Sequence, residues 1–364
     1  MRLGVVTTSY PRFPGDPAGN FVAAHVAALR ALGHRVEVIA AGDPGPRGEL
    51  HSDVRDELHR IDSDLFYRGG APDAFERAPL GAGIAAALFT ARLTVAVTAR
   101  ARPWEAIVAH WLAPSALAAL PSGRPLIAIA HGGDVFTLRR LRLLRPALHA
   151  LARRDARLVF VSEQLRATAR AAAPALAPWL DRAIIQPMGI DVTRFAALPR
   201  EPADPPIVLV AARLVPIKGV DVAIAAMRHV HGARLVIAGD GPERARLDRS
   251  STATFLGEVT TDHRDDLLRT ASVVVVPSRA LPSGRTEGTP AIALEALAAG
   301  VPVVASAVGG LCELPGVRLV PPDDPHALAC AIEQSITRPP PPQTLRAGVA
   351  KFDWREIAQR LIRE

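Results

Sequence analysis

The feature of the sequence that most constrains its fold is a regular alternation of short apolar runs with longer amphipathic segments. The runs are rich in Val, Ile, Leu and Ala, which is typical of strands that a parallel sheet buries on both faces. They fall at 3–7, 36–40, 107–109, 126–130 and 158–161 in the first half, and at 207–211, 234–238, 273–276, 301–305 and 318–320 in the second. The alternation predicts an α/β fold, and its restart at residue 207 predicts two Rossmann-like β/α domains.

Length and composition also indicate two packed domains. The chain has 364 residues, of which 49% are hydrophobic and 4% aromatic. That length suits two domains of ordinary size, and the apolar content argues against disorder. So few aromatic side chains argue against a stacking surface for single-stranded nucleic acid. We expect the first domain to cover 1–186 and the second 187–345, with the linker region at 198–206, where four prolines occur.

The positive charge of the chain is concentrated in its first half. The net charge is +7, and residues 1–185 hold 23 Lys and Arg against 16 Asp and Glu. Arginines crowd the segment 139–157, where leucines recur every three or four residues, which predicts an amphipathic helix or helix pair. A basic face of this kind is typical of contact with an anionic membrane surface or ligand, and a solvated face is the alternative. No nucleic-acid motif accompanies the charge, so nucleic acid is not expected as a partner.

No segment has the pattern of a targeting or membrane-spanning sequence. The first residues run directly into a strand, so we expect no signal peptide. The longest uncharged runs are 78–91, which is too short to span a bilayer, and 296–312, which Gly and Pro interrupt. Cys312 and Cys330 have no metal or redox spacing. We therefore expect a cytoplasmic protein, with the Arg-rich segment as its contact with the inner face of the plasma membrane.

In the first half, polar residues follow the apolar strands at the edge where open parallel sheets bind ligands. Two strands end in histidine, at His110 and at His131, and the second is followed by two glycines and Asp134. A neutral histidine can donate to a sugar hydroxyl, although a structural role is the alternative for both. Gly19 precedes the first helix, where a glycine lets the backbone approach a ligand. The Asp-x-Asp at 62–64 follows no buried strand, and we interpret it as solvated surface.

In the second half, the loop after the first strand carries two cations, Arg213 and Lys218. Lys218 is one of only two lysines in the chain, and a compact ammonium suits a diphosphate. Farther on, Glu287-Gly288-Thr289-Pro290 precedes an apolar helix that contains Glu295 and ends at Gly300. The amides at the start of such a helix favour an anion, and two carboxylates near a phosphate suggest that they hold hydroxyls. The alternative is an ordinary buried helix with one surface glutamate at each end.

Taken in order, these motifs resemble the retaining glycosyltransferases of family 4, which have the GT-B fold. The resemblance spans nearly the whole chain and includes the Gly19 loop, His131-Gly-Gly-Asp134, Gly189-Ile-Asp191, Arg213-x4-Lys218-Gly219, Gly239-Asp-Gly-Pro242, Phe255-Leu-Gly257, Glu287-x7-Glu295 and Phe352-x-Trp354. It implies two domains facing a central cleft, an acceptor-binding first domain and a nucleotide-sugar-binding second domain. It also implies a C-terminal segment, 346–364, whose helix crosses back onto the first domain.

The resemblance also implies roles for individual residues. Arg213 and Lys218 would hold the donor diphosphate, Glu287 would face the donor sugar, and Glu295 would bind the ribose hydroxyls. The remaining donor-binding positions would be Gly19, Gly239, Val259, Gly288 and Thr289. The catalytic group would comprise His131, Glu287, Arg213 and Lys218, and His110 and Asp134 would lie on the acceptor side. The sequence departs from many relatives at Gly19-Asn20 and Thr289-Pro290, where they have a Gly pair and an aromatic-Gly pair.

We therefore expect a metal-independent, retaining hexosyltransferase that uses a UDP- or GDP-linked sugar and needs no cofactor. The acceptor would be a sugar or a lipid-linked sugar in cell-envelope polysaccharide or glycolipid synthesis. One alternative keeps the fold and changes the chemistry, as in a nucleotide-sugar epimerase or a phosphorylase. Another is a non-catalytic module that binds sugar or membrane.

Overall fold

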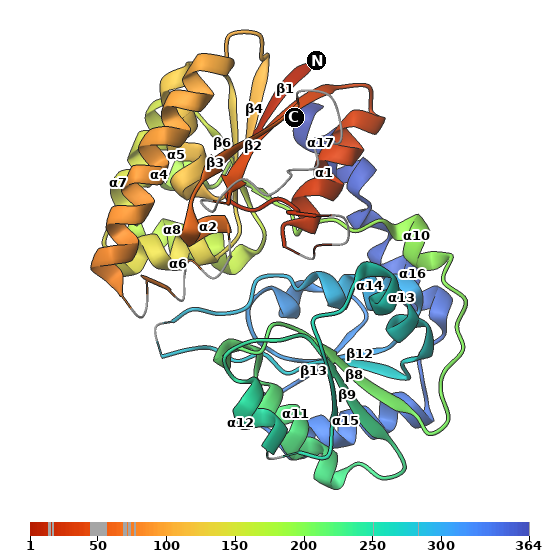
Figure 1. Ribbon diagram of the computed structural model, residues 1–364. Helices are drawn as coiled ribbons and strands as arrows, with labels where there is room; N and C mark the ends of the chain where they lie inside the picture. The colour runs from red at the N-terminus through yellow and green to blue at the C-terminus, as the bar shows by residue number, and fades with distance from the viewer. Residues whose placement is uncertain are drawn as a thin grey trace. The chain divides into compact units, whose positions relative to one another are not determined.

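The computed structural model describes residues 1–13, 16, 18–43, 57–67, 71, 74–75, 78–249, 251–282 and 284–363. These residues form two compact units (Figure 1). Unit 1 consists of residues 1–187 and 357–364, and unit 2 of residues 188–356. Both have the Rossmann-like layout that the strand pattern predicts, and the last helix, α17 (Trp354–Arg363), begins in unit 2 and continues into unit 1.

Unit 1 is built on a seven-stranded sheet in the order β3-β2-β1-β4-β5-β6-β7, with every strand parallel to its neighbours. The strands are β1 (Arg2–Val6), β2 (Arg35–Gly42), β3 (Leu58–Asp62), β4 (Ala106–His110), β5 (Leu126–Ala130), β6 (Arg157–Phe160) and β7 (Ile184–Ile185). β4 and β5 are buried along their whole length, as their continuous apolar runs predict.

Helices cover both faces of this sheet. Figure 1 shows α4 (Pro79–Arg100), α5 (Leu117–Ala119) and α7 (Leu144–Arg153) on one face, and α1 (Asn20–Ala31) and α17 on the other. Other helices among the described residues of unit 1 are α2 (Asp64–Tyr67), α6 (Gly133–Arg140), α8 (Glu163–Ala172) and α9 (Ala177–Leu180). Among the described residues, α4 is the one helix that is long and apolar enough to cross a membrane, by length and composition alone. It is longer than the uncharged run that the sequence shows because Arg92 lies within the helix.

The Arg-rich segment forms a helix pair with a turn between its members. Helix α6 ends at Arg140 and α7 begins at Leu144, and Arg142 between them has a positive φ of 59°. Leu144, Leu148 and Leu151 are buried, which confirms the amphipathic pattern. Arg157, at the end of the segment, lies in β6 and donates from Nη1 to the carbonyl oxygen of Leu361 in α17 at 2.6 Å, so it belongs to the packing of unit 1.

The strand β3 is not among the strands that the apolar runs predict. It lies at the edge of the sheet beside β2, and its residues are exposed or partly exposed, so it has no apolar run. The Asp-x-Asp begins at Asp62, the last residue of this strand, and both Asp62 and Asp64 are exposed.

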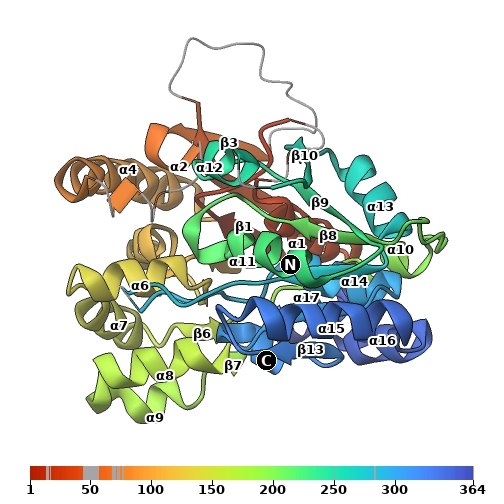
Figure 2. The ribbon, with the colours of Figure 1, turned by 90° about the horizontal axis from the view of Figure 1, so that it is seen from below.

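Unit 2 has a six-stranded parallel sheet in the order β10-β9-β8-β11-β12-β13, and Figure 2 shows β10 and β13 at its two edges. The strands are β8 (Ile207–Ala211), β9 (Arg234–Ala238), β10 (Thr254–Gly257), β11 (Val273–Val276), β12 (Val303–Ser306) and β13 (Val317–Val320). Successive residues enter opposite cores, since Leu209 packs with α14 (Ala291–Ala299) and Val208 packs with α11 (Val220–Ala226) and α15 (Pro325–Thr337). Other helices are α10 (Val192–Ala196), α12 (Arg244–Arg249), α13 (Thr261–Thr270) and α16 (Pro342–Val349).

Helix α14 confirms the prediction made from the Pro290 motif. Pro290 is its N-cap, and Gly300 ends it in the left-handed conformation with φ 78°. Residues 293–299 are all buried, so this helix lies in the core of unit 2. Its burial includes Glu295, which is only 6% exposed.

Candidate functional site

In unit 2, two predicted residues meet beyond the carboxyl ends of the strands. Lys218 ends the turn that follows β8, and its Nζ lies 2.6 Å from Oε2 of Glu287, which lies 69 residues later between β11 and α14. Ser278, two residues after the end of β11, donates from Oγ to the same carboxylate oxygen at 3.1 Å. The two ionic side chains are 22% and 13% exposed, so the pair is reachable but largely shielded from water.

Close backbone packing between loops fixes this cluster. Gly219 has φ +59°, and a Cβ there would lie 2.0 Å from the carbonyl oxygen of Pro277. Gly309, after β12, has φ +55°, and its Cβ would lie 1.9 Å from the carbonyl oxygen of Glu287. Only glycine permits both the left-handed backbone and this approach. The loops that carry Lys218 and Glu287 are therefore positioned by glycines beside them.

Arg213, Gly239 and the pair Gly288 and Thr289 lie at the same edge of this sheet. Arg213 is exposed on the loop that also carries Lys218. Gly239 follows β9 and donates its amide to the carbonyl oxygen of Gly257 at 2.6 Å. Gly288 and Thr289 are partly buried, and the amide of Gly310 donates to the carbonyl oxygen of Glu287 at 3.3 Å, directly beside them. Their contacts with a donor stay predictions.

Glu295 belongs to a second charged group within unit 2. Its Oε1 lies 3.1 Å from Nη1 of Arg264, which comes from α13. Burial raises the pKa of Glu295, and the positive charge of Arg264 opposes that shift. Arg264 was not predicted from the sequence, because nothing local distinguishes it from the many other arginines. Val259, just before α13, is partly buried and packs against the core of unit 2.

In unit 1, the two strand-end histidines belong to a chain of three imidazoles. Nδ1 of His25 on α1 lies 3.1 Å from Nε2 of His110, and Nδ1 of His110 lies 3.0 Å from Nε2 of His131. His25 and His110 are fully buried, whereas His131 is partly exposed. His110 therefore lies one ring behind His131, and it can act on an acceptor only through that residue. His25 was not predicted from the sequence, because it is 85 residues from His110 and no local pattern marks it.

Burial keeps these histidines neutral. It lowers the pKa of His25 to about 4 and that of His131 to about 3, and it lowers the pKa of His110 well below its usual value. A neutral imidazole has one donor and one acceptor nitrogen, so the three rings must donate in one direction along the chain. Because Nε2 of His131 is taken by His110, Nδ1 is the nitrogen that a substrate can approach, and the direction of the chain decides whether it donates or accepts.

Asp134 organises the loops around His131. Its Oδ2 accepts the amide of Leu112 at 2.6 Å, and its Oδ1 accepts the amides of Gly132 at 3.0 Å and His131 at 3.2 Å. Burial raises the pKa of Asp134, and these backbone hydrogen bonds oppose the shift. The structure thus gives Asp134 a positioning role between the ends of β4 and β5, and its predicted contact with an acceptor stays a prediction.

Two further residues complete this edge of unit 1. Trp111 has a positive φ of 73°, which is strained for a bulky side chain, and its ring centroid is 4.7 Å from that of His131. Trp111 was not predicted to have a role. Gly19 is the N-cap of α1 with φ 70°, and a Cβ there would lie 2.6 Å from the backbone of Ser9. Its predicted contact with the donor stays a prediction.

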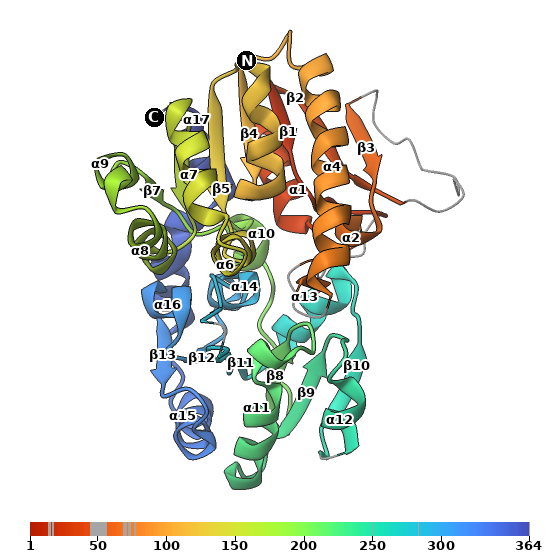
Figure 3. The same ribbon diagram turned by 90° about the vertical axis from the view of Figure 1, so that its left-hand side faces the viewer.

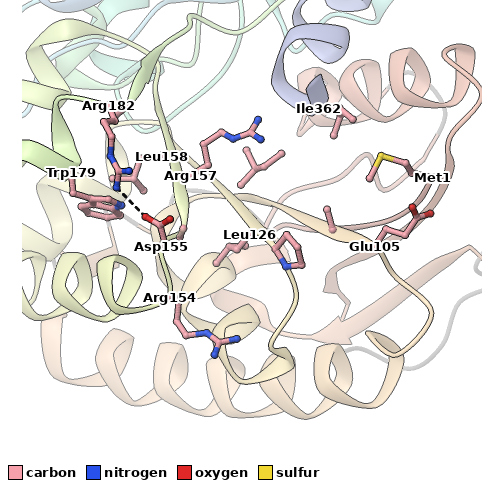
Figure 4. A pocket seen from close by; sticks show the side chains of 15 residues that line it. Met1, Glu105, Leu126, Arg154, Asp155, Arg157, Leu158, Trp179, Arg182 and Ile362 are labelled. Carbon is pink, nitrogen blue, oxygen red and sulfur yellow. Dashed lines mark hydrogen bonds and ion pairs between the residues drawn. The ribbon is translucent and has the colours of Figure 1, made fainter. Parts of the chain in front are cut away.

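Pockets lie at opposite edges of the unit 1 sheet. One, of about 420 Å³, lies at the carboxyl edge between α4 and α6 and includes Trp111 and Asp134. The other, of about 510 Å³, is lined by Glu105, Arg154, Arg157 and Arg182 at the amino edge (Figure 4). It contains no predicted site residue, and Arg182 is already paired with Asp155 at 3.0 Å. The pocket at the carboxyl edge is therefore the one relevant to ligand binding.

Among the residues that the structure describes, no group of three or more His, Cys, Asp or Glu side chains is arranged to hold a metal ion. The metal independence of the enzyme stays a prediction.

The sequence matches two family profiles, which together account for most of the chain. Residues 205–338 match the family described as Glycosyl transferases group 1. Residues 18–178 match the Glycosyl transferase 4-like domain. The first profile covers the Lys218 and Glu287 cluster of unit 2, and the second covers the His25, His110 and His131 chain of unit 1.

Individual proteins show the same relationship. A glycogen synthase of Mycobacterium tuberculosis is 30% identical over 407 residues, which covers 98% of this chain and 92% of that protein. The GDP-mannose-dependent alpha-(1-6)-phosphatidylinositol monomannoside mannosyltransferase of the same organism is 36% identical over 148 residues, or 35% of this chain and 38% of that protein. Among solved structures, Anabaena HepE in complex with UDP and glucose matches with a TM-score of 0.70 at 18% identity, covering 100% of this chain and 98% of HepE, which shows a shared fold alone.

Proposed function

This chain belongs to the group 1 glycosyltransferases and has their GT-B type of fold, and we propose that it moves a sugar from a nucleoside-diphosphate sugar to an acceptor hydroxyl with retention of anomeric configuration. Unit 2 binds the donor in this proposal, and unit 1 binds the acceptor. The observation that carries it is the contact between Lys218 and Glu287, which joins two distant motifs at the ligand edge of the unit 2 sheet.

The donor diphosphate is bound by cations and backbone amides in this proposal. An ammonium group has three donors, and the bond to Glu287 occupies one of them, so Lys218 can also reach a phosphate oxygen. Arg213 supplies a second cation, and the chain around Gly288 and Thr289 supplies amides before α14. Glu287 faces the donor sugar, and Glu295 accepts from the ribose hydroxyls.

Transfer begins as the bond between the anomeric carbon and the diphosphate oxygen breaks. Positive charge develops on the sugar as an oxocarbenium-like state, and negative charge develops on the leaving diphosphate. Arg213, Lys218 and the start of α14 stabilise that negative charge, so that no metal is required. The acceptor hydroxyl attacks from the face that the diphosphate leaves, which retains the configuration. Its proton passes to an oxygen of the leaving diphosphate as the new bond forms. His131 orients the substrate through Nδ1.

The names of the relatives suggest which substrates to test. HepE was solved with UDP and glucose, and the mannosyltransferase uses GDP-mannose and acts on a phosphatidylinositol mannoside. We infer a UDP- or GDP-linked hexose as the donor and a sugar or lipid-linked sugar as the acceptor, in envelope polysaccharide or glycolipid synthesis. The exposed arginines of the α6 and α7 segment favour a peripheral site on the cytoplasmic face of the membrane.

A thermal-shift panel of UDP-, GDP- and ADP-sugars, with no added metal, tests the donor assignment. The matching donor should stabilise the protein by about 2.7 kcal/mol at a hundredfold excess over Kd. Lys218→Ala should remove most of that stabilisation, and Lys351→Ala, which changes the other lysine of the chain, should leave it unchanged. The assignment fails if no nucleotide sugar stabilises the protein, or if the two lysine variants behave alike.

A further inference from the structure

The pocket at the carboxyl edge of unit 1 has walls of mostly apolar side chains. Helix α4 contributes Gly83, Ala86 and Ala87, and the helix α6 region contributes Leu138 and Leu141. Its volume of about 420 Å³ falls in the range of about 300–1,000 Å³ that small-molecule pockets have. A nucleotide sugar or a free sugar needs many hydrogen-bonding groups, and these walls supply few.

One end of the pocket reaches the residues around His131. Trp111 and Asp134 both line it, and the Trp111 ring lies 4.7 Å from the His131 ring. An occupant of the pocket would therefore place one end beside the imidazole that the proposed function assigns to the acceptor. The strained backbone of Trp111, with φ 73°, holds its ring at this boundary between an apolar space and a polar group.

The apolar surface continues out of the pocket along α4. Leu80, Ile84, Leu88 and Val95 of this helix are 84%, 65%, 58% and 71% exposed. The wall residue Ala87 and the exposed Leu88 are neighbours on α4, so the pocket wall and this exposed stripe adjoin on the helix. Figure 3 shows α4 along its whole length. A contiguous apolar surface of this kind marks an interaction site.

Positive charge adjoins the same pocket. Leu141 and Leu143 line it, and they alternate with Arg140 and Arg142, which are exposed. Leu143 is itself 50% exposed. Apolar contact next to arginine is complementary to a molecule with an aliphatic body and an anionic head, which is the chemistry of an anionic lipid.

We propose that this pocket binds the aliphatic or prenyl chain of an anionic lipid-linked acceptor, with the exposed stripe of α4 resting on the membrane from which the chain comes. Arg140 and Arg142 meet the anionic group of neighbouring lipid, and the chain enters between α4 and α6. The head of the acceptor then lies toward Trp111 and His131. The inference rests on the proposed function for its acceptor, and it names the chemical class of that acceptor.

Alkyl phosphates of increasing chain length, used below their micelle concentrations, test the pocket directly by calorimetric titration of the full chain. Each methylene that the pocket buries should tighten Kd about fourfold, or about 0.8 kcal/mol, until the pocket is full. Gly83→Phe places a ring in the pocket and should weaken decyl phosphate at least tenfold. Gly81→Phe is the matched control, because both glycines lie on α4 with no heavy atom within 4 Å of an added Cβ, and only Gly83 lines the pocket.

The proposal is overturned if Kd does not depend on chain length, or if Gly83→Phe and Gly81→Phe bind decyl phosphate equally well. It is also overturned if phosphatidylglycerol vesicles bind the protein while no alkyl phosphate does, since the membrane contact then takes up no single chain. Decyl phosphate binding without transfer from any nucleotide sugar would support the pocket and refute the proposed function. Sugar transfer to an acceptor without a lipid chain, at a rate that Gly83→Phe does not change, would support the proposed function and refute the lipid pocket.

Discussion

The buried histidine chain of unit 1 makes its stability depend on pH, and His25 is the residue on which this can be measured. Burial lowers the pKa of His25 from 6.5 to about 4 in the folded protein. Below pH 6.5 the imidazole of His25 is protonated in the unfolded chain, whereas in the folded chain it stays neutral until about pH 4. The free energy of unfolding is therefore fully retained above pH 6.5 and falls as the pH decreases through this window, by about 1.4 kcal/mol per pH unit.

The magnitude for His25 alone follows from the same two values. At pH 5 the loss should be roughly 2 kcal/mol, and it should reach roughly 3 kcal/mol near pH 4. His110 and His131 add losses of the same sign, because burial lowers their pKa values too. Asp134 acts in the opposite direction, since its raised pKa favours the protonated carboxyl in the folded state. A variant that changes His25 alone isolates its own share.

His25→Asn keeps a polar group next to His110 and removes the titration. Between pH 7 and pH 5, the variant should lose less unfolding free energy than the wild type loses. The difference between the two losses should be about 2 kcal/mol. Hydrogen–deuterium exchange of the β4 amides measures the unfolding free energy of unit 1. The variant and the wild type are compared at equal pH, so that the intrinsic exchange rate cancels. His149→Asn on α7, a partly exposed position in the same unit, is the control. If His25→Asn and the wild type lose stability equally between pH 7 and pH 5, His25 is not held neutral in the folded state.

Three further predictions concern unit 2. Lys218→Ala or Arg213→Ala should lower turnover by 10²-fold or more, because each loses about 3 kcal/mol of charge stabilisation on the leaving diphosphate. A near-normal kcat in both variants would contradict their assignment to the donor diphosphate. Arg264→Met should destabilise the protein by about 3–5 kcal/mol in urea unfolding, because Glu295 would remain buried without its partner. The double variant Arg264→Met with Glu295→Gln should recover part of this loss of stability. If it recovers none, the pairing of Arg264 with Glu295 is contradicted. Removal of divalent ions with EDTA should leave turnover within about twofold, since cations and amides take the place of a metal; a loss that Mg²⁺ or Mn²⁺ restores would contradict this.

Sequence periodicity was sufficient for most of the fold. The run 126–130 is β5 and the run 207–211 is β8, because a strand buried on both faces must be apolar throughout. It failed at β3, where an exposed edge strand needs no apolar run. The helix after Pro290 and its end at Gly300 were predictable because proline and glycine act on the backbone locally.

The candidate site was predictable only in its components. Lys218 was noticeable because lysine is rare in this chain, and Glu287 because it precedes a proline-started helix. The sequence could not show that their side chains meet at 2.6 Å, since 69 residues separate them. Arg264 and His25 were missed for the same reason, because their partners Glu295 and His110 come from other elements and leave no local pattern.

The sequence by itself thus determined the order of strands and helices, the two-unit plan and the positions of the glycines and prolines that end helices, because each of these depends on neighbours within one or two turns of chain. Only the tertiary structure decided which charged and titratable groups share a location, which of them are buried and therefore shifted in pKa, and where an apolar pocket opens beside His131. Those properties depend on distances between residues that the chain brings together only when the sheets form, and desolvation acts on that three-dimensional neighbourhood.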